Sequence, residues 1–207
     1  EDGIRDYKVT GVQTCALPIS GNPNAPSTGA AGSIDITAKS LQGLQLSQGS
    51  RIDSATSSSL PYWLDADLGH ITITSPHVSL SGGSTITAQT SGAARGGNIS
   101  FNSKVPNDLT IALDAGSSIN AKSNQSATGN GGAVQIGTID KSLTIKGAGL
   151  ITVETQSSGQ GGDITLDGSA ISISQTETTA KTSGSGKGGK ISITGRSEEH
   201  TSELQSP

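Results

Sequence analysis

A short pattern, glycine followed by alternating aliphatic residues, recurs six times along this chain. The copies are AGSIDIT (31–37), LGHITIT (68–74), GGNISFN (96–102), GGAVQIG (131–137), GGDITLD (161–167) and GGKISIT (188–194), and they begin 27 to 37 residues apart. Self-similarity with a period of about 30 residues is typical of repeat architectures, in which each unit buries its apolar face against its neighbours. The chain is therefore expected to fold as a stack of similar units.

Two further strand-like segments follow each of the first five copies. The second carries Leu44/Leu46, Val78/Leu80, Ile111/Leu113, Leu143/Ile145 and Ile171/Ile173, and the third carries Ile52, Ile86, Ile119 and Ile151. In these first four units, six residues separate the last aliphatic residue of the second segment from the first of the third. We expect one fixed corner there. In the fifth unit, TTAKT (178–182) matches ITAQT (86–90) if the corner is one residue shorter.

Three short strands per unit, with Gly, Ser and Asn between them, predict an all-β fold, a right-handed parallel β-helix of about five coils. A β-sandwich would pair neighbouring strands through hairpins and would not require segments one period apart to resemble each other. In a β-helix each strand pairs with its own copy in the next coil, so that like side chains stack. The glycine pairs suit bends with positive φ, or places where one coil packs closely on the next.

Alternation within the third segment also predicts an interior column of hydroxyl groups. Counting by twos from each third-segment anchor leads to Thr56, Thr90, Ser123, Thr155 and Thr182. A buried hydroxyl without a partner costs about 1–3 kcal/mol. These five residues should therefore point inward and bond to bend backbone or to one another.

The two ends of the chain lack this rhythm. If residues 196–206 are written as codons beginning AGA TCG GAA, the reverse complement with one G added in front translates as VTGVQTCALPIS, residues 9–20. Such a string resembles a DNA-sequencing library adapter. We therefore expect residues 1–20 and 196–207 to be adapter-derived rather than native, and residues 21–195 to be the β-helix repeat fragment.

Composition narrows the function classes. The formal net charge is −4 and no positive cluster is present, so nucleic acid is not an expected partner. No apolar run approaches the ~20 residues that span a bilayer, which argues against membrane insertion. Cys15, in the first end, is the only cysteine.

No cofactor or metal site is expected. The Gly-Gly segments lack a P-loop ending. Asp163 has no acidic counterpart in the other repeats, where the aligned residues are Ser33, His70, Asn98, Ala133 and Lys190.

One irregular segment stands out as a candidate ligand site. SSSLPYWLDADL (57–68) lengthens its unit and contains Tyr62, Trp63, Asp65 and Asp67. Exposed aromatic residues can stack on sugar rings or anchor a protein partner, although such a pair can also cover an apolar flank. The two aspartates near His70 are the most catalytic-looking group. A solvated loop is the simpler interpretation, and we expect no catalytic residue, with His70 and His77 at the surface.

The stretches GGNISF…GSSINAKSNQSATGNGG and LGHITIT…VSLSGGSTITAQTSGAARGG resemble the repeats of filamentous-haemagglutinin-like exoproteins, which bacteria export by two-partner secretion. The resemblance covers residues 28–195. It implies a long β-helical stalk that serves adhesion, secreted or on the outer cell surface. It also implies, as partner, an outer-membrane secretion pore that recognises an N-terminal domain not visible in this chain.

The sequence therefore predicts a structural, non-enzymatic stalk segment of an adhesin-like exoprotein, with a surface glycan or protein as its expected partner. The alternative is a carbohydrate-active β-helix, similar to polysaccharide lyases or hydrolases, which would need acids and a base converging within ~6 Å in a groove.

Overall fold

The computed structural model describes residues 32–56, 69–103, 108–124, 127–138, 141–156 and 158–195. Within them, all regular structure is β-strand, in three parallel sheets. Sheet 1 contains β1 (Ile34–Thr37), β4 (Ile71–Thr74), β7 (Ile99–Asn102), β10 (Val134–Gly137), β13 (Ile164–Gly168) and β16 (Ile191–Gly195). Sheet 2 contains β2 (Leu44–Leu46), β5 (His77–Leu80), β8 (Leu109–Leu113), β11 (Leu143–Lys146) and β14 (Ile171–Ser174). Sheet 3 contains β3 (Arg51–Thr56), β6 (Thr85–Thr90), β9 (Ser118–Ser123), β12 (Leu150–Thr155) and β15 (Glu177–Thr182).

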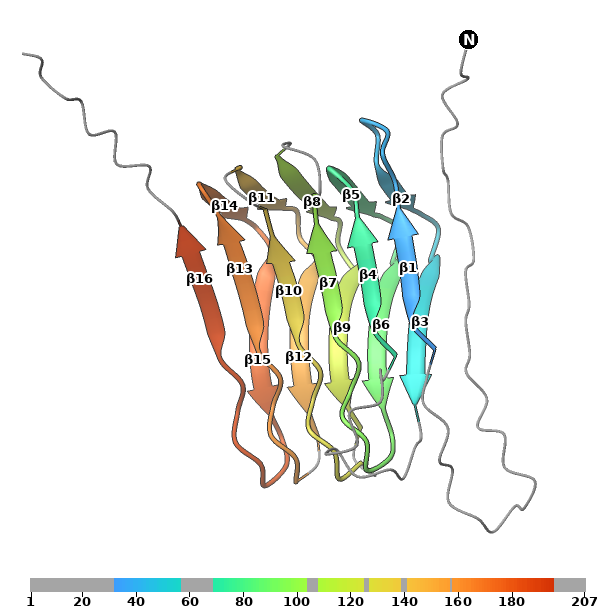
Figure 1. Ribbon diagram of the computed structural model, residues 1–207, viewed down its shortest axis with the longest axis vertical. Coiled ribbons are helices and arrows are strands. Elements are labelled where there is room, and N and C mark those ends of the chain that lie inside the picture. Colours follow the sequence, from blue (N-terminus) through green and yellow to red (C-terminus); the bar gives the residue numbers. More distant parts are fainter. Residues whose placement is uncertain are drawn as a thin grey trace, which may run out of the picture.

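The chain visits the three sheets in turn and winds as a right-handed parallel β-helix (Figure 1). We number the coils from the N-terminal side, so that β1 to β3 form coil 1 and β13 to β15 form coil 5, while β16 begins another turn. Each strand pairs in parallel with its equivalents in the neighbouring coils. The fold predicted from the repeats is thus confirmed.

Alternating side chains explain why these segments form strands. In sheet 1, Ile71 and Ile73 point inward and are fully buried, whereas Thr72 and Thr74, which alternate with them, lie on the outer face. Strand pairing places Ile99 and Phe101 beside them in the next coil. β-branched residues suit a pleated surface of this kind, and period two divides them between core and solvent. The core is therefore a set of aliphatic columns that run along the stack.

The second glycine of each pair lies where successive coils come closest together. A Cβ added to Gly132 would collide with the carbonyl oxygen of Gly97, one on Gly162 with that of Gly132, and one on Gly189 with that of Gly162. None of these four glycines has positive φ. Of the two explanations considered for the pairs, close packing between coils is therefore the one that holds at Gly132, Gly162 and Gly189.

The interior hydroxyl column is confirmed at Thr90, Ser123 and Thr155, while the side chain of Thr56 lies outside the described part of the chain. Backbone pairing aligns Thr56, Thr90, Ser123, Thr155 and Thr182 in that order. Thr90, Ser123 and Thr155 are fully buried and donate to the carbonyl oxygens of Ala94 at 3.0 Å, Gly129 at 3.1 Å and Gln160 at 3.3 Å. Thr182, partly buried at the end of the stack, donates to the carbonyl oxygen of Thr155 at 3.1 Å. Three of these bonds hold the bend that follows the strand.

The expectation of one fixed six-residue corner is wrong for coil 4. Ile145 pairs with Ile111, and Leu143 pairs with Leu109, so the second strand of coil 4 is shifted by two residues from the predicted alignment. Ile151 nevertheless pairs with Ile119 as expected. The corner between them is therefore two residues shorter than in coil 3. Gly147 and Gly149 make this shorter corner possible, because an added Cβ on either would collide with Leu113 of coil 3.

A glycine substitution tests the close packing between coils. We expect Gly162→Ala to lower the free energy of unfolding by about 3 kcal/mol, because rigid backbone has to move to admit the methyl group. Gly188→Ala, where an added Cβ meets nothing within 4 Å, is the matched control and should change stability little. Denaturant unfolding followed by circular dichroism measures both. Equal effects of the two variants would contradict the packing explanation.

The hydroxyl column is tested by an isosteric change. Thr90→Val keeps the shape of the side chain but leaves the buried Ala94 carbonyl without its donor, so we expect a loss of about 1–3 kcal/mol. Thr144→Val, on the outer face of β11, is the control and should stay within about 0.5 kcal/mol of the parent. A Thr90→Val protein as stable as the control would show that the hydrogen bond contributes nothing.

Candidate functional site

The aromatic segment singled out from the sequence lies outside the described residues. Tyr62, Trp63, Asp65 and Asp67 belong to the stretch between Thr56, which ends β3, and Gly69, which precedes β4. Their role in ligand binding therefore stays a prediction.

His70 and His77, the two histidines noted in the sequence, are both partly buried. His70 Nδ1 accepts a hydrogen bond from the Asn98 backbone N–H at 3.0 Å, and Asn98 Oδ1 accepts one from the Ala133 N–H at 2.9 Å. These two side chains thus join coil 2 to coil 3 and coil 3 to coil 4. His77 is partly buried, and burial, followed by the nearby positive charge of Lys146, lowers its pKa. A neutral imidazole is favoured there.

The most distinctive surface feature of the described chain lies at the corner between sheets 2 and 3. In coils 1 to 3 this corner is a turn of four residues that ends in serine: 47–50, 81–84 and 114–117. The serine hydroxyl closes each turn, as in Ser84 Oγ donating to the Ser81 carbonyl oxygen at 2.6 Å. In coil 4, Lys146 pairs with Ala112 and Leu150 with Ser118, so only residues 147–149 stand against the five residues 113–117 of coil 3. Coil 5 has only Gln175 and Thr176 at this corner. The turns 47–50, 81–84 and 114–117 follow one another along the stack, and we call this row the corner ridge. It ends at coil 3.

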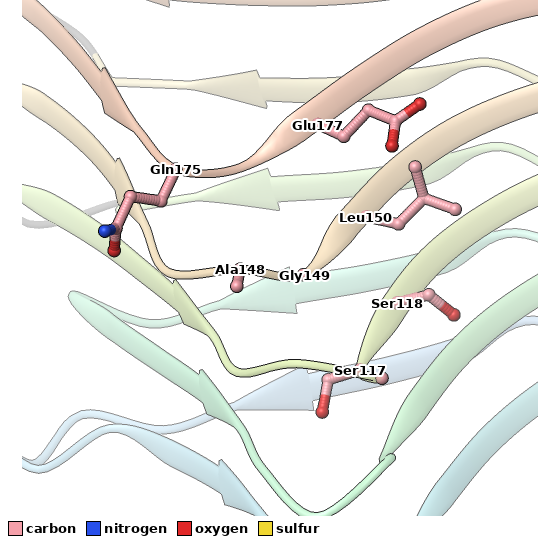
Figure 2. A pocket seen from close by; sticks show the side chains of 8 residues that line it. Ser117, Ser118, Ala148, Gly149, Leu150, Gln175 and Glu177 are labelled. Atoms are coloured by element: carbon pink, nitrogen blue, oxygen red, sulfur yellow. The ribbon is translucent and has the colours of Figure 1, made fainter.

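Two hollows lie where the ridge ends. One, of about 370 Å³, is lined by Gly116, Ser117, Ser118, Ala148, Gly149, Leu150, Gln175 and Glu177 (Figure 2). The other, of about 390 Å³, is lined by Ser79, Leu80, Ser81, Ala112, Leu113, Asp114, Lys146, Gly147, Ser174 and Gln175. Gln175 borders both, so the hollows meet across the corner. We call the two together the corner notch.

The backbone of the corner notch is held from three coils. Leu150 N–H donates to the Ser117 carbonyl oxygen at 3.1 Å, and Glu177 N–H donates to the Gly149 carbonyl oxygen at 3.1 Å. On the sheet 2 side, Thr176 Oγ1 donates to the Gly147 carbonyl oxygen at 2.8 Å. Each wall is thus bonded to the floor between them. The notch is preformed, as ligand sites usually are.

Charge in the corner notch is mixed and close to the surface. Asp114 Oδ1 accepts from Ser117 Oγ at 2.7 Å, and Oδ2 accepts from the Gly82 backbone N–H at 2.9 Å. The hydrogen bond from Ser117, and then that from Gly82, lower the pKa of Asp114 below its ordinary 3.8. Lys146 lines the same hollow, and Glu177 the other. Asp114, Glu177 and Lys146 are therefore the charged side chains that line the notch.

Within the described residues, no group of three or more His, Cys, Asp or Glu side chains could hold a metal ion. Nor does that part of the chain contain a helix long and apolar enough to cross a bilayer. Comparisons with models of known protein families, with curated proteins and with solved structures find no match.

Sequence reasoning did not find the corner notch. Its wall residues are a scattered Ser, Gln and Glu, none of which forms a motif, and the notch exists only because coils 4 and 5 have shorter corners than coil 3. The available signal was Gly147-Ala148-Gly149, where the first three coils carry a turn that ends in Ser50, Ser84 or Ser117. A strand alignment that assumed a constant corner concealed it.

The hydrogen bonds of Asp114 predict a pH-dependent contribution to stability. Because its pKa is lower in the folded than in the unfolded chain, the contribution is fully present above the unfolded pKa and is lost as the pH falls through the folded pKa. We expect the stability difference between the parent and Asp114→Asn to be constant near neutral pH and to shrink in acid below pH ~4. Urea unfolding at several pH values measures it, with Asp35→Asn, at an exposed position on β1, as control. A difference that does not depend on pH would contradict this role.

Proposed function

We propose that this chain is a structural stalk segment of a large adhesin-like bacterial exoprotein, secreted or held on the outer cell surface. The observation that carries the proposal is the one-dimensional stacking of self-similar coils, each paired in parallel with its neighbours. In such a stack, stability is a sum of coil and interface terms, so the length can grow without redesign of the core. A rod of this kind separates a binding tip from a surface.

The end of the stack supports this role. Ile191 and Ile193 are 40% and 57% exposed, whereas Ile164 and Leu166, their partners one coil earlier, are fully buried. Among the described strands, β14, β15 and β16 are the outermost of their sheets and pair with a strand on one side only. The last coil thus presents the same aliphatic and hydrogen-bonding pattern that each earlier coil presents to the next. A stack with such an end can be extended by further coils.

Export through an outer-membrane secretion pore fits the same architecture. Repeat proteins can nucleate locally and propagate unit by unit, so each coil can form on the one before it as the chain emerges. The partner pore, and the N-terminal domain that it would recognise, come from the family resemblance of the repeats. A surface glycan or protein is the proposed adhesion partner, with Tyr62 and Trp63 as the first candidates from sequence.

The carbohydrate-active alternative receives less support. Glycoside hydrolysis needs one carboxyl group that stays protonated near neutral pH, as a general acid. In the corner notch the pKa of Asp114 is shifted in the opposite direction by Ser117 and Gly82. No salt bridge joins Asp114 to Lys146 in the described part of the chain. Asp114 therefore lacks the raised pKa that a general acid needs.

A mechanical experiment tests the stalk function. The full chain is held by its two ends and extended with optical tweezers. We expect rupture in successive steps of about 100 Å, the extended length of one coil of about 30 residues at ~3.4 Å each. Stepwise extension would show that the coils unfold one at a time under force, as expected for a stalk. A single cooperative event, or release of reducing ends from any polysaccharide in a parallel assay, would contradict it.

A further inference from the structure

The corner notch has the chemistry of a carbohydrate site. Its walls carry the hydroxyl group of Ser118, the amide of Gln175 and the carboxylate of Glu177, whereas the Ser117 hydroxyl is buried and donates to Asp114 Oδ1. An amide and a carboxylate beside a serine hydroxyl suit a ligand that both donates and accepts hydrogen bonds at several points. Figure 2 shows the Gln175 side chain on one side of the floor and those of Glu177 and Ser118 on the other. A ligand lying across the floor could contact both groups.

The floor of the notch permits close approach. Gly147 and Gly149 have no side chain, and Ala148 between them adds a single exposed methyl group. Leu150 supplies a larger apolar surface at one side. A sugar ring presents C–H groups on its faces and hydroxyl groups around its edge. Its face would lie against Ala148 and Leu150 while its edge bonds to the walls.

Size and charge narrow the ligand class. Each hollow is at the small end of the range of about 300–1,000 Å³ seen for ligand sites, and the two meet at Gln175, which suits consecutive units of a chain better than one compact molecule. Asp114 and Glu177 outweigh Lys146 in charge, so sulfated or phosphorylated ligands are disfavoured. An anionic ligand is therefore excluded, and among oligosaccharides the neutral ones suit this charge.

We infer that the corner notch is a binding site for a neutral oligosaccharide. Gln175 and Glu177 bond to its hydroxyl groups, and Ala148 and Leu150 contact a ring face. One sugar unit occupies each hollow, and the oligosaccharide crosses the corner over Gln175. This site names a partner class for the stalk proposed above and depends on that function only for its biological role.

Backbone amide shifts measured by NMR on the full chain test the site directly. The probes are cellotriose, maltotriose and N,N′,N″-triacetylchitotriose. We expect at least one to cause saturable shifts in Gly149, Gln175 and Glu177, with little change in coils 1 and 2. Ala148→Leu fills the floor and should weaken that binding at least tenfold. Ala115→Leu, at an exposed alanine of the coil 3 corner that lines neither hollow, should leave it unchanged.

Glu177→Gln removes the negative charge of the carboxylate and keeps the shape of the side chain. It keeps the size of the side chain and should weaken binding severalfold, with the spectrum of the free protein otherwise preserved. Three outcomes would overturn the site: no saturable shift with any of the three probes, equal effects of Ala148→Leu and Ala115→Leu, or the same shifts with a Ser/Gly/Asn peptide and none with the sugars. Binding is measured apart from extension under load, so the site and the stalk function can fail independently.

Discussion

Parallel pairing between successive coils is the interaction on which the rest of the structure depends. Each strand takes its hydrogen-bond partners from the coil before and the coil after, so the coils have to lie one strand spacing apart, about 4.8 Å, along the whole stack. At the bend before sheet 1 this distance leaves no room for a Cβ, and the carbonyl oxygens of Gly97, Gly132 and Gly162 lie where the side chain of the next coil would start. The repeated glycine pair is thus a steric consequence of the coil spacing.

The same spacing determines what fills the interior. Aliphatic residues one coil apart are neighbours, as Ile52, Ile86, Ile119 and Ile151 are in sheet 3, and they form continuous apolar columns. Where the chain leaves sheet 3, the columns give way to hydroxyl groups that hold the carbonyl oxygens of the bend. Apolar burial and bend carbonyl groups that accept from a buried hydroxyl therefore recur together in coils 2, 3 and 4.

Function is expected where this regularity changes. The corner between sheets 2 and 3 tolerates different lengths because it lies outside the paired strands, and a corner lost from one coil exposes the flanks of its neighbours. The shift of Ile145 onto Ile111 leaves the core columns filled while it removes the turn outside them. A site can thus be formed on a rigid rod without disturbance of the stack, with walls contributed by coils 3 and 5 and a floor by coil 4.

The sequence by itself determined the fold class, the positions of the sheet 1 and sheet 3 strands and the hydroxyl column, because stacking makes like residues one period apart direct neighbours. It could not determine the register of β11, since both Ile111 and Leu113 offered an aliphatic partner for Ile145, and local alternation fits either one. Only the tertiary structure decided between them: Gly147 and Gly149 pass beneath Leu113, where no side chain fits. The corner notch follows from that choice. Its residues come from three coils, and their proximity depends on the difference between corner lengths, which no single segment of the sequence contains.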